Sequence, residues 1–174
     1  RYVERVRGTR AQIFDTRKTL PGLRALEKYA VRAGGGHNHR ADLSEAILIK
    51  TNHLKAATSD KRQATAEIIL AAVAKARRGK PAKFVEVEVT NLKEFNAALR
   101  AKPHAVLLDN WPLANIRKAV QLRNRLSTRV LLEVSGGVTL NNVRRIAATG
   151  VDRISIGRLT HSALSVDVSL QVLS

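Results

Sequence analysis

The feature that most constrains the fold is a regular alternation of short apolar runs with amphipathic segments. Six runs have the length and the β-branched or apolar composition of strands: residues 12–16, 46–49, 84–89, 105–109, 130–134 and 153–157. Several are almost continuously apolar, as expected of parallel strands that are covered on both faces. From residue 84 onward the runs recur at nearly even spacing, which is the rhythm of an α/β barrel.

Apolar residues at helical spacing fill the segments between the runs. The first segment places Leu23, Leu26, Tyr29 and Ala30 on one helical face, and the pattern returns within residues 68–76, 92–99, 116–120 and 143–147. Strands alternating with helices predict a parallel sheet with right-handed crossovers. We therefore predict one α/β domain, a partly open, TIM-like parallel barrel of about six strands, with a flat doubly wound sheet as the alternative.

Composition narrows the possible partners. A net charge of +17 attracts nucleic acid, anionic membranes or phosphorylated small molecules. Aromatic residues make up only 3%, too few for the stacking platforms of single-strand binders, and no apolar run is long enough to span a membrane. We expect no membrane partner, and nucleic-acid binding only as nonspecific electrostatic attraction. The absence of cysteine excludes disulfides and suits a cytoplasmic protein.

Charged residues, histidines or glycine turns follow almost every predicted strand. The carboxyl ends of the strands are where an α/β barrel has its active site. The strand ends and the loop GGGHNHR (34–40) supply cations, carboxylates and glycine turns: Arg17, Lys18, His39, Arg40, Lys50, Glu88, Asp109, Ser135, Gly136, Gly157 and His161. Arginine grips carboxylate or phosphate with paired hydrogen bonds. Glu88 and Asp109 are the carboxylates best placed to hold Mg²⁺. The glycines of the last two strands suit phosphate binding through backbone N–H groups. The set predicts a substrate with carboxylates, a phosphate and a magnesium-bound pyrophosphate.

Other interpretations of these residues remain open at this point. A strand-end cation is often a solvated charge on the rim of the barrel. Glu86 and Glu88 fall on the same face of their strand by parity, where unpaired burial would be costly, and this favours a functional role. A serine-nucleophile triad of Ser135, His161 and Asp109 lacks the G-x-S-x-G elbow of such enzymes.

Six motifs, taken in order, resemble the barrel domain of the quinolinate phosphoribosyltransferase family: FDTRKTLPGLRALEKYAVRAGGGHNHR, ILIKTNH, VEVEV, LLDN, LEVSGG and ISIGRLTHSA. The resemblance covers the chain from about residue 12 to the last strand. It implies a pentosyltransferase reaction in de novo NAD biosynthesis. Quinolinate and phosphoribosyl pyrophosphate (PRPP), with Mg²⁺, give nicotinate mononucleotide, pyrophosphate and CO2.

The resemblance also implies a role for each matching residue. Arg17, His39 and Arg40 would clamp the quinolinate carboxylates. Lys18 and Lys50 would lie near the ring and the pyrophosphate, as catalytic and substrate-binding residues. Glu88 and Asp109 would be the catalytic acids around the magnesium-bound ribose pyrophosphate. The 5′-phosphate cradle would comprise Ser135, Gly136, Gly157 and His161.

Members of this family carry an α/β sandwich domain before the barrel and form homodimers, in which that domain closes the partner's active site and contributes an arginine. We accordingly expect residues 1–11 to be the end of the interdomain helix and 12–174 to be the catalytic barrel. We also expect the sandwich domain to be absent from this sequence, an absence that would impair activity. Two alternatives remain open. One is a related pyrophosphorylase that uses another aromatic acid, and the other is a non-catalytic basic scaffold that binds nucleic acid or other polyanions.

Overall fold

A computed structural model of the protein describes residues 1–56, 65–78 and 83–172. Its core is a six-stranded, all-parallel sheet with the order β1-β6-β5-β4-β3-β2. The strands are β1 (Gln12–Phe14), β2 (Ala46–Ile49), β3 (Phe84–Val89), β4 (Ala105–Asp109), β5 (Leu131–Ser135) and β6 (Arg153–Ser155). All six predicted strands are confirmed, although β1 and β6 each end two residues earlier than predicted.

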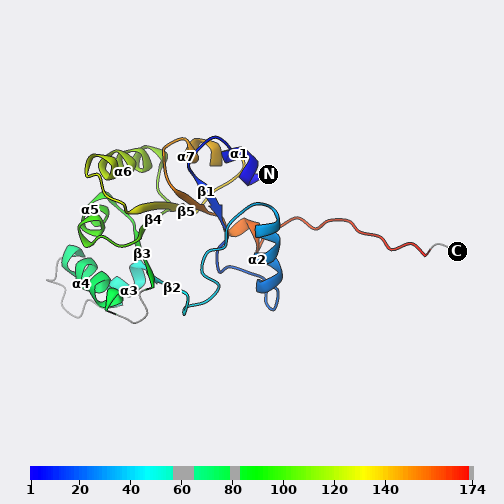
Figure 1. Ribbon diagram of the computed structural model, residues 1–174, viewed down its shortest axis with the longest axis horizontal. Helices are drawn as coiled ribbons and strands as arrows, with labels where there is room; N and C mark the ends of the chain where they lie inside the picture. Colours follow the sequence, from blue (N-terminus) through cyan, green and yellow to red (C-terminus); the bar gives the residue numbers. More distant parts are fainter. Residues whose placement is uncertain (57–64, 79–82, 173–174) are drawn as a thin grey trace.

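The strand order is the cyclic order of an α/β barrel that is open between β1 and β2 (Figure 1). In place of β2, the glycine loop runs along the free edge of β1. The backbone N–H of His37 donates to the carbonyl of Ile13 at 2.8 Å, and the N–H of Asp15 donates to the carbonyl of His37 at 3.1 Å. This isolated bridge explains how a loop with three glycines is held against the sheet, and the partly open barrel is the predicted fold class.

Helices cover the outer face of the sheet (Figure 1). They are α1 (Tyr2–Val6), α2 (Arg24–Ala33), α3 (Thr51–Ala56), α4 (Thr65–Arg77), α5 (Leu92–Ala101), α6 (Leu113–Arg125) and α7 (Val143–Ala147), and a 3-10 turn, η1 (Gly157–Leu159), follows β6. From α4 to α7 the predicted apolar faces are buried, as Ile69, Phe95 and Ile116 illustrate. Asn91 caps the start of α5: its side chain accepts a hydrogen bond from the Glu94 N–H at 3.0 Å and so satisfies a donor of the first helical turn.

The two faces of the sheet differ sharply in chemistry. Side chains alternate between faces along a strand, so Val85 and Val87 join the apolar core under the helices, while Glu86 and Glu88 point to the inner face. The inner face is polar in β5 and β6 as well, where Glu133 and Ser155 are buried. The interior of the barrel therefore carries charge that has to be paired.

Helix α2 departs from the prediction. Its apolar residues Leu26 and Tyr29 are 64% and 61% exposed, whereas Lys28 is only 4% exposed. The helix was predicted correctly, but its apolar side is not the buried one. The buried side is set by polar contacts of Lys28. Its Nζ lies 2.7 Å from Asp15 Oδ1 and 2.8 Å from the carbonyl oxygen of His39, so the lysine faces inward.

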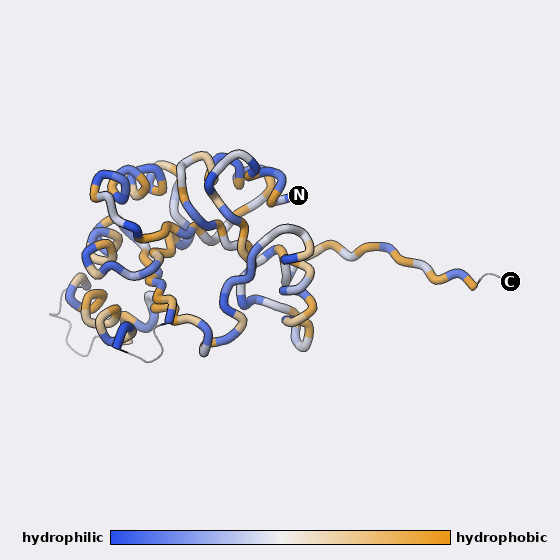
Figure 2. The backbone as a smooth tube through the Cα atoms, in the orientation of Figure 1, coloured by the Kyte–Doolittle hydropathy of each residue, from blue (hydrophilic) through white to orange (hydrophobic). Residues whose placement is uncertain are grey.

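After η1 the chain runs out from the body as an extended segment (Figures 1 and 2). Its apolar side chains alternate with polar ones and are highly exposed: Leu164, Val166, Val168, Leu170 and Val172. In the described residues, the helices are too short or too polar to cross a membrane.

Candidate active site

One cavity at the carboxyl ends of the strands collects the predicted site. It has a volume of about 510 Å³, and all eleven residues singled out from the sequence line it: Arg17, Lys18, His39, Arg40, Lys50, Glu88, Asp109, Ser135, Gly136, Gly157 and His161. They come from all six strand ends and from the loop after α2. Residues so far apart in sequence meet because parallel strands present their carboxyl ends at the same edge of the sheet.

The arginines form the cationic part of the cavity. The Nε atoms of Arg17 and Arg40 are both buried and have no hydrogen-bond partner among the described residues. Arg40 Nη1 donates to the carbonyl of Ala46 at 2.7 Å, which fixes this guanidinium group. Burial, and then the positive charge of Arg17, lower the pKa of Arg40. Two neighbouring guanidinium groups with unpaired donors suit a ligand with carboxylates. Lys18 and Lys50 are exposed at the rim of the same cavity.

A buried carboxylate holds the loop that carries Arg40. Asp15 is fully buried and accepts three hydrogen bonds: from Lys28 Nζ at 2.7 Å, from the His39 N–H at 2.8 Å and from Asn38 Nδ2 at 2.6 Å. Asp15 lies in the run 12–16 that was predicted as a strand, and no role was predicted for it. The arrangement explains how β1 and α2 together fix the positions of His39 and Arg40.

Two glycines shape the opposite side of the cavity. Gly136 has φ +84°, and a Cβ atom there would overlap the side-chain amide of Asn110. At Gly157 a Cβ atom would lie 2.8 Å from His161 Nε2. A side chain is therefore excluded at Gly136, and at Gly157 it would displace the His161 ring. Both glycines leave backbone close to the cavity, which suits an anionic group that binds backbone N–H donors.

The two candidate metal-binding carboxylates come from neighbouring strands. Glu88 on β3 accepts a hydrogen bond from the Thr51 N–H at 3.3 Å and another from the Thr51 hydroxyl. Asp109 at the end of β4 accepts from Asn110 Nδ2 at 3.0 Å. Both are partly exposed to the cavity. One or two carboxylates together with substrate oxygens are the usual environment of Mg²⁺, and this donor set fits that ion.

A buried charge network below the cavity contains residues that the sequence analysis missed. His39 Nε2 lies 3.0 Å from Glu86 Oε2 and 3.5 Å from Glu133 Oε1, and Arg153 Nε lies 2.8 Å from Glu133 Oε2. Neither Glu133 nor Arg153 was selected from the sequence. A signal existed for Glu133: it stands two residues before Ser135 on the same strand, so parity directs it to the same side.

Burial sets the protonation of this network. Desolvation, and then the negative charge of Glu86, raise the pKa of Glu133 to about 7. Desolvation also raises the pKa of Glu86 and lowers the pKa of His39. The three side chains place ligand atoms within 4.8 Å of one another, close enough to hold a metal ion. Because the Arg153 guanidinium already supplies the positive charge beside Glu133, we assign no metal to this cluster.

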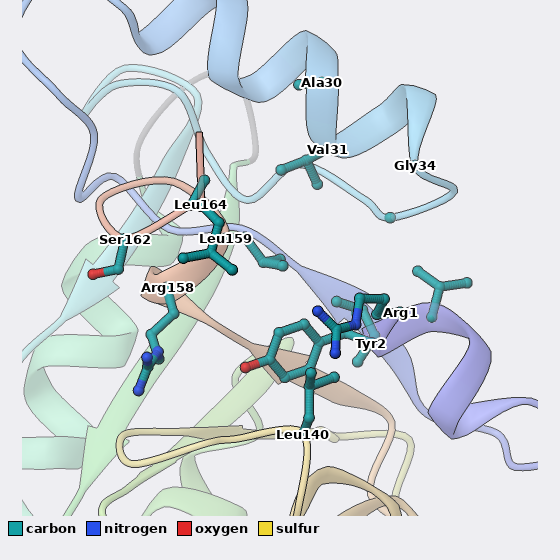
Figure 3. A pocket seen from close by; sticks show the side chains of 14 residues that line it. Arg1, Tyr2, Ala30, Val31, Gly34, Leu140, Arg158, Leu159, Ser162 and Leu164 are labelled. Carbon is teal, nitrogen blue, oxygen red and sulfur yellow. The ribbon is translucent and has the colours of Figure 1, made fainter. Parts of the chain in front are cut away.

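A second hollow, of about 430 Å³, lies between α1, α2 and the turn after β6 (Figure 3). Tyr2, Val31, Leu159 and Leu164 line it, and Arg158 is the residue that it shares with the larger cavity. Apart from Arg1 and Arg158 its lining carries no charged side chain. It therefore lacks the groups that the predicted chemistry needs.

The serine-triad alternative finds no support in the contacts of the described residues. His161 Nδ1 lies 2.7 Å from the hydroxyl of the adjacent Ser162, and no hydrogen bond joins His161 to Ser135 in this part of the chain. A nucleophile and its base should be within hydrogen-bonding reach.

Comparisons with known proteins agree with the resemblance in the sequence. Residues 1–171 match the sequence model described as quinolinate phosphoribosyl transferase, C-terminal domain. The chain is 46% identical to the nicotinate-nucleotide pyrophosphorylase [carboxylating] of Mycobacterium leprae, covering 98% of this chain and 57% of that protein. The rat protein of the same name is 38% identical, with 95% of this chain and 52% of that protein covered.

A solved structure gives the same result. The nicotinate-nucleotide pyrophosphorylase from Francisella tularensis superimposes with a TM-score of 0.85 at 44% identity, covering 99% of this chain and 56% of that one. The chain thus spans about half the length of the relatives it matches. With the family match over nearly the whole chain, the protein belongs to the quinolinate phosphoribosyl transferase family and corresponds to the C-terminal domain of its members.

Proposed function

We propose that this chain provides the catalytic barrel for phosphoribosyl transfer from PRPP to quinolinate, with loss of CO2, in NAD biosynthesis. The products are nicotinate mononucleotide, pyrophosphate and CO2. The observation that carries the proposal is the convergence of cations, carboxylates and glycine turns in one cavity of a family member. The cavity is large enough for ligands of this size.

The arginines have the role of holding the aromatic dicarboxylate. Arg17 and Arg40 both line the cavity, and each has a buried Nε donor without a partner among the described residues. Each guanidinium group can bind a carboxylate with charge-assisted hydrogen bonds. A bound dicarboxylate presents its ring nitrogen in one orientation, because two fixed cations engage its two charged groups. Nicotinate has only one of these carboxylates, so the clamp distinguishes the two acids.

The transfer step displaces pyrophosphate from the anomeric carbon of PRPP. The ring nitrogen supplies the electron pair for the new C–N bond, and the breaking C–O bond leaves its pair on pyrophosphate. Glu88 and Asp109 face the cavity as carboxylates that stabilise positive charge on the sugar, while Lys18 and Lys50 neutralise the leaving group. A bound Mg²⁺, held by the same two carboxylates and the pyrophosphate oxygens, would supply further charge neutralisation. Gly136, Gly157 and their neighbours would hold the 5′-phosphate through backbone N–H groups.

The ribosylated ring then loses its adjacent carboxylate as CO2. The electron pair of the breaking C–C bond stays on the ring carbon, where the positive charge of the adjacent ring nitrogen stabilises it, and a proton then adds to that carbon. No organic cofactor is required for this step, because the substrate itself carries the stabilising positive charge.

We also propose that the chain acts within a homodimer. The uncovered apolar side chains Leu26 and Tyr29 on α2, beside the cavity loop, favour a covering domain or subunit there. Sedimentation of the chain alone and of a form that carries a family N-terminal domain tests this. A cytoplasmic location stays a prediction from the cysteine-free sequence.

The test of the main proposal is PRPP-dependent release of CO2 from carboxyl-labelled quinolinate. It is run with the chain alone and with the N-terminal domain of the M. leprae relative supplied. We expect release that requires Mg²⁺ and disappears in Arg17→Ala, while an exposed-arginine variant on α5, Arg100→Ala, retains it. No release in either setting, from folded protein, would contradict the proposal.

A basic scaffold that binds nucleic acid is the competing interpretation, favoured only by the net charge of +17. It predicts binding that weakens by orders of magnitude between low and moderate salt, with no preference among aromatic acids. The same preparations tested for DNA binding at two salt concentrations separate the two functions.

A further inference from the structure

The His39 ring is held by hydrogen bonds at both of its nitrogens. The backbone N–H of Arg40 donates to Nδ1 at 2.8 Å, so Nδ1 is an acceptor. Nε2 lies 3.0 Å from Glu86 Oε2 and 3.5 Å from Glu133 Oε1. Since a carboxylate only accepts, the neutral ring carries its proton on Nε2. His39 is thus a fixed part of the cavity floor, with its polar atoms already engaged.

Glu133 is the carboxylate of this network that forms an ion pair with Arg153. It pairs in register with Arg153 on the neighbouring strand, and Arg153 Nε lies 2.8 Å from its Oε2. The Arg153 guanidinium is itself fixed over the Phe14 ring at 3.9 Å and near the Phe84 ring at 5.2 Å. With side-chain exposures of 1% for Glu133 and 11% for Arg153, this pair is rigid and largely shielded from water.

Every element around Glu133 contributes a polar partner or a close neighbour. The loop after α2 supplies His39, β3 supplies Glu86, and β6 supplies Arg153 and the hydroxyl of Ser155. From β4 the registered neighbour is the apolar Leu107. Glu133 also lines the large cavity, so it connects the charge pair inside the barrel to the ligand space above.

The connection reaches the cationic clamp in two steps. Glu133 and Glu86 orient the His39 ring, and the ring accepts the N–H of Arg40, whose guanidinium faces the cavity. We propose that Glu133, fixed by Arg153, is a positioning residue that holds the His39 ring and the Arg40 backbone, and thereby the clamp for the aromatic dicarboxylate. The inference rests on the proposed function for the identity of that ligand.

If Glu133 positions the His39 ring, its substitution should change the ring as well as ligand binding, which a purely structural role would not require. Removing Glu133 leaves Glu86 as the carboxylate beside His39 Nε2 and leaves Arg153 without its ion pair. The Nε2–H tautomer remains, but the ring loses one of the two carboxylates that fix its orientation. Glutamine at this position keeps an oxygen acceptor for His39 but loses the ion pair to Arg153. The effect should therefore be graded, with alanine worse than glutamine.

The experiment combines a spectroscopic and a binding readout on the chain itself. The ring nitrogen shifts of His39 report its tautomer by NMR without any ligand, and calorimetry gives the Kd for quinolinate. The variants are Glu133→Ala and Glu133→Gln. The matched control is Asp152→Asn. Asp152 is another buried carboxylate paired with an arginine, Arg123 at 2.7 Å, but it stands before β6, where its carboxylate accepts the Leu132 N–H near the start of β5, away from the carboxyl ends of the strands that form the cavity.

We expect Glu133→Ala to shift the ring nitrogen signals of His39 and to weaken quinolinate binding by about 10-fold or more, the scale seen when groups that orient a ligand-binding residue are removed. Glu133→Gln should keep the Nε2–H tautomer and lose less affinity, and Asp152→Asn should change neither readout. A folded Glu133→Ala or Glu133→Gln protein with an unchanged His39 signature and unchanged Kd would overturn the inference. A wild-type chain that does not bind quinolinate, with His39 still dependent on Glu133, would overturn the proposed ligand and leave the positioning of the ring established.

Discussion

Lys28 Nζ lies 2.7 Å from Asp15 Oδ1, and both side chains are buried. This pair ties α2 to the end of β1, and the same carboxylate accepts the N–H of His39. A helix whose apolar residues are exposed is therefore attached to the barrel through a charge. The pair fixes the loop that brings His39 and Arg40 into the cavity.

Removing one member of this pair should be strongly destabilising. In Lys28→Met the buried Asp15 carboxylate loses its counter-charge, and we expect the free energy of unfolding to fall by about 3–5 kcal/mol, as when one partner of a buried pair is deleted. Urea denaturation measures the change. The double variant Lys28→Met, Asp15→Asn should recover part of the loss because no unpaired charge remains, and a double variant no more stable than the single one would contradict this account.

Gly136 should tolerate no side chain. In Gly136→Ala the new Cβ overlaps the Asn110 amide, and the residue must hold φ +84°. We expect a loss of stability of about 1–3 kcal/mol and weaker phosphate binding by calorimetry. Gly137→Ala is the matched control: it also has positive φ, +60°, but open space around the Cβ position. Equal effects of the two changes would show that overlap with Asn110 is unimportant.

The raised pKa of Glu133 predicts a pH dependence of stability. Burial in the folded state favours the protonated carboxyl of Glu133. The favourable contribution of this protonated group to the free energy of unfolding is therefore complete below the ordinary pKa of 4.5 and is lost as the pH rises through about 7. The free energy of unfolding of the wild-type chain should thus decline over this window relative to Glu133→Gln, by at most about 3 kcal/mol. Denaturation midpoints at pH 4.5, 6 and 7.5 measure the difference, and parallel curves would refute the burial of an ionisable Glu133.

The two cavity carboxylates should govern the use of Mg²⁺. In Glu88→Gln and in Asp109→Asn one hard, charged oxygen ligand is lost, and we expect the affinity for PRPP in the presence of Mg²⁺ to fall about 10-fold or more, with little change in its absence. Calorimetry with and without Mg²⁺ gives the comparison. Glu67→Gln, an exposed position on α4, is the control. Metal-independent losses of equal size would assign these acids a role other than metal binding.

Local patterns predicted much of this fold because each pattern depends only on residues that are close together in the sequence. Runs such as FVEVEV are strands whose parity separates the outer Val87 from the inner Glu86, and Asn91 caps a helix through its own side chain. Strand ends pointed to the cavity residues because parallel strands share one functional edge. These predictions required no knowledge of partners distant in the sequence.

The failures concern pairing across the fold. Leu26 and Tyr29 formed the apolar face of a helix, but the buried face was decided by Asp15, 13 residues before Lys28. Likewise Glu133 and Arg153 have no distinguishing feature in the sequence, and only the strand register brings them together inside the barrel. Charge pairs between elements leave no periodic signal, so a sequence alone does not reveal which charges are buried.

The central claim is that the cations of the cavity form a clamp for an aromatic dicarboxylate, and selective binding tests it most directly. Calorimetric titration of the chain at moderate salt compares quinolinate with nicotinate, in the wild type and in Arg40→Ala. We predict that quinolinate binds more tightly than nicotinate and that the preference disappears in the folded variant. Equal binding of the two acids, or a preference that survives in Arg40→Ala, would contradict the clamp.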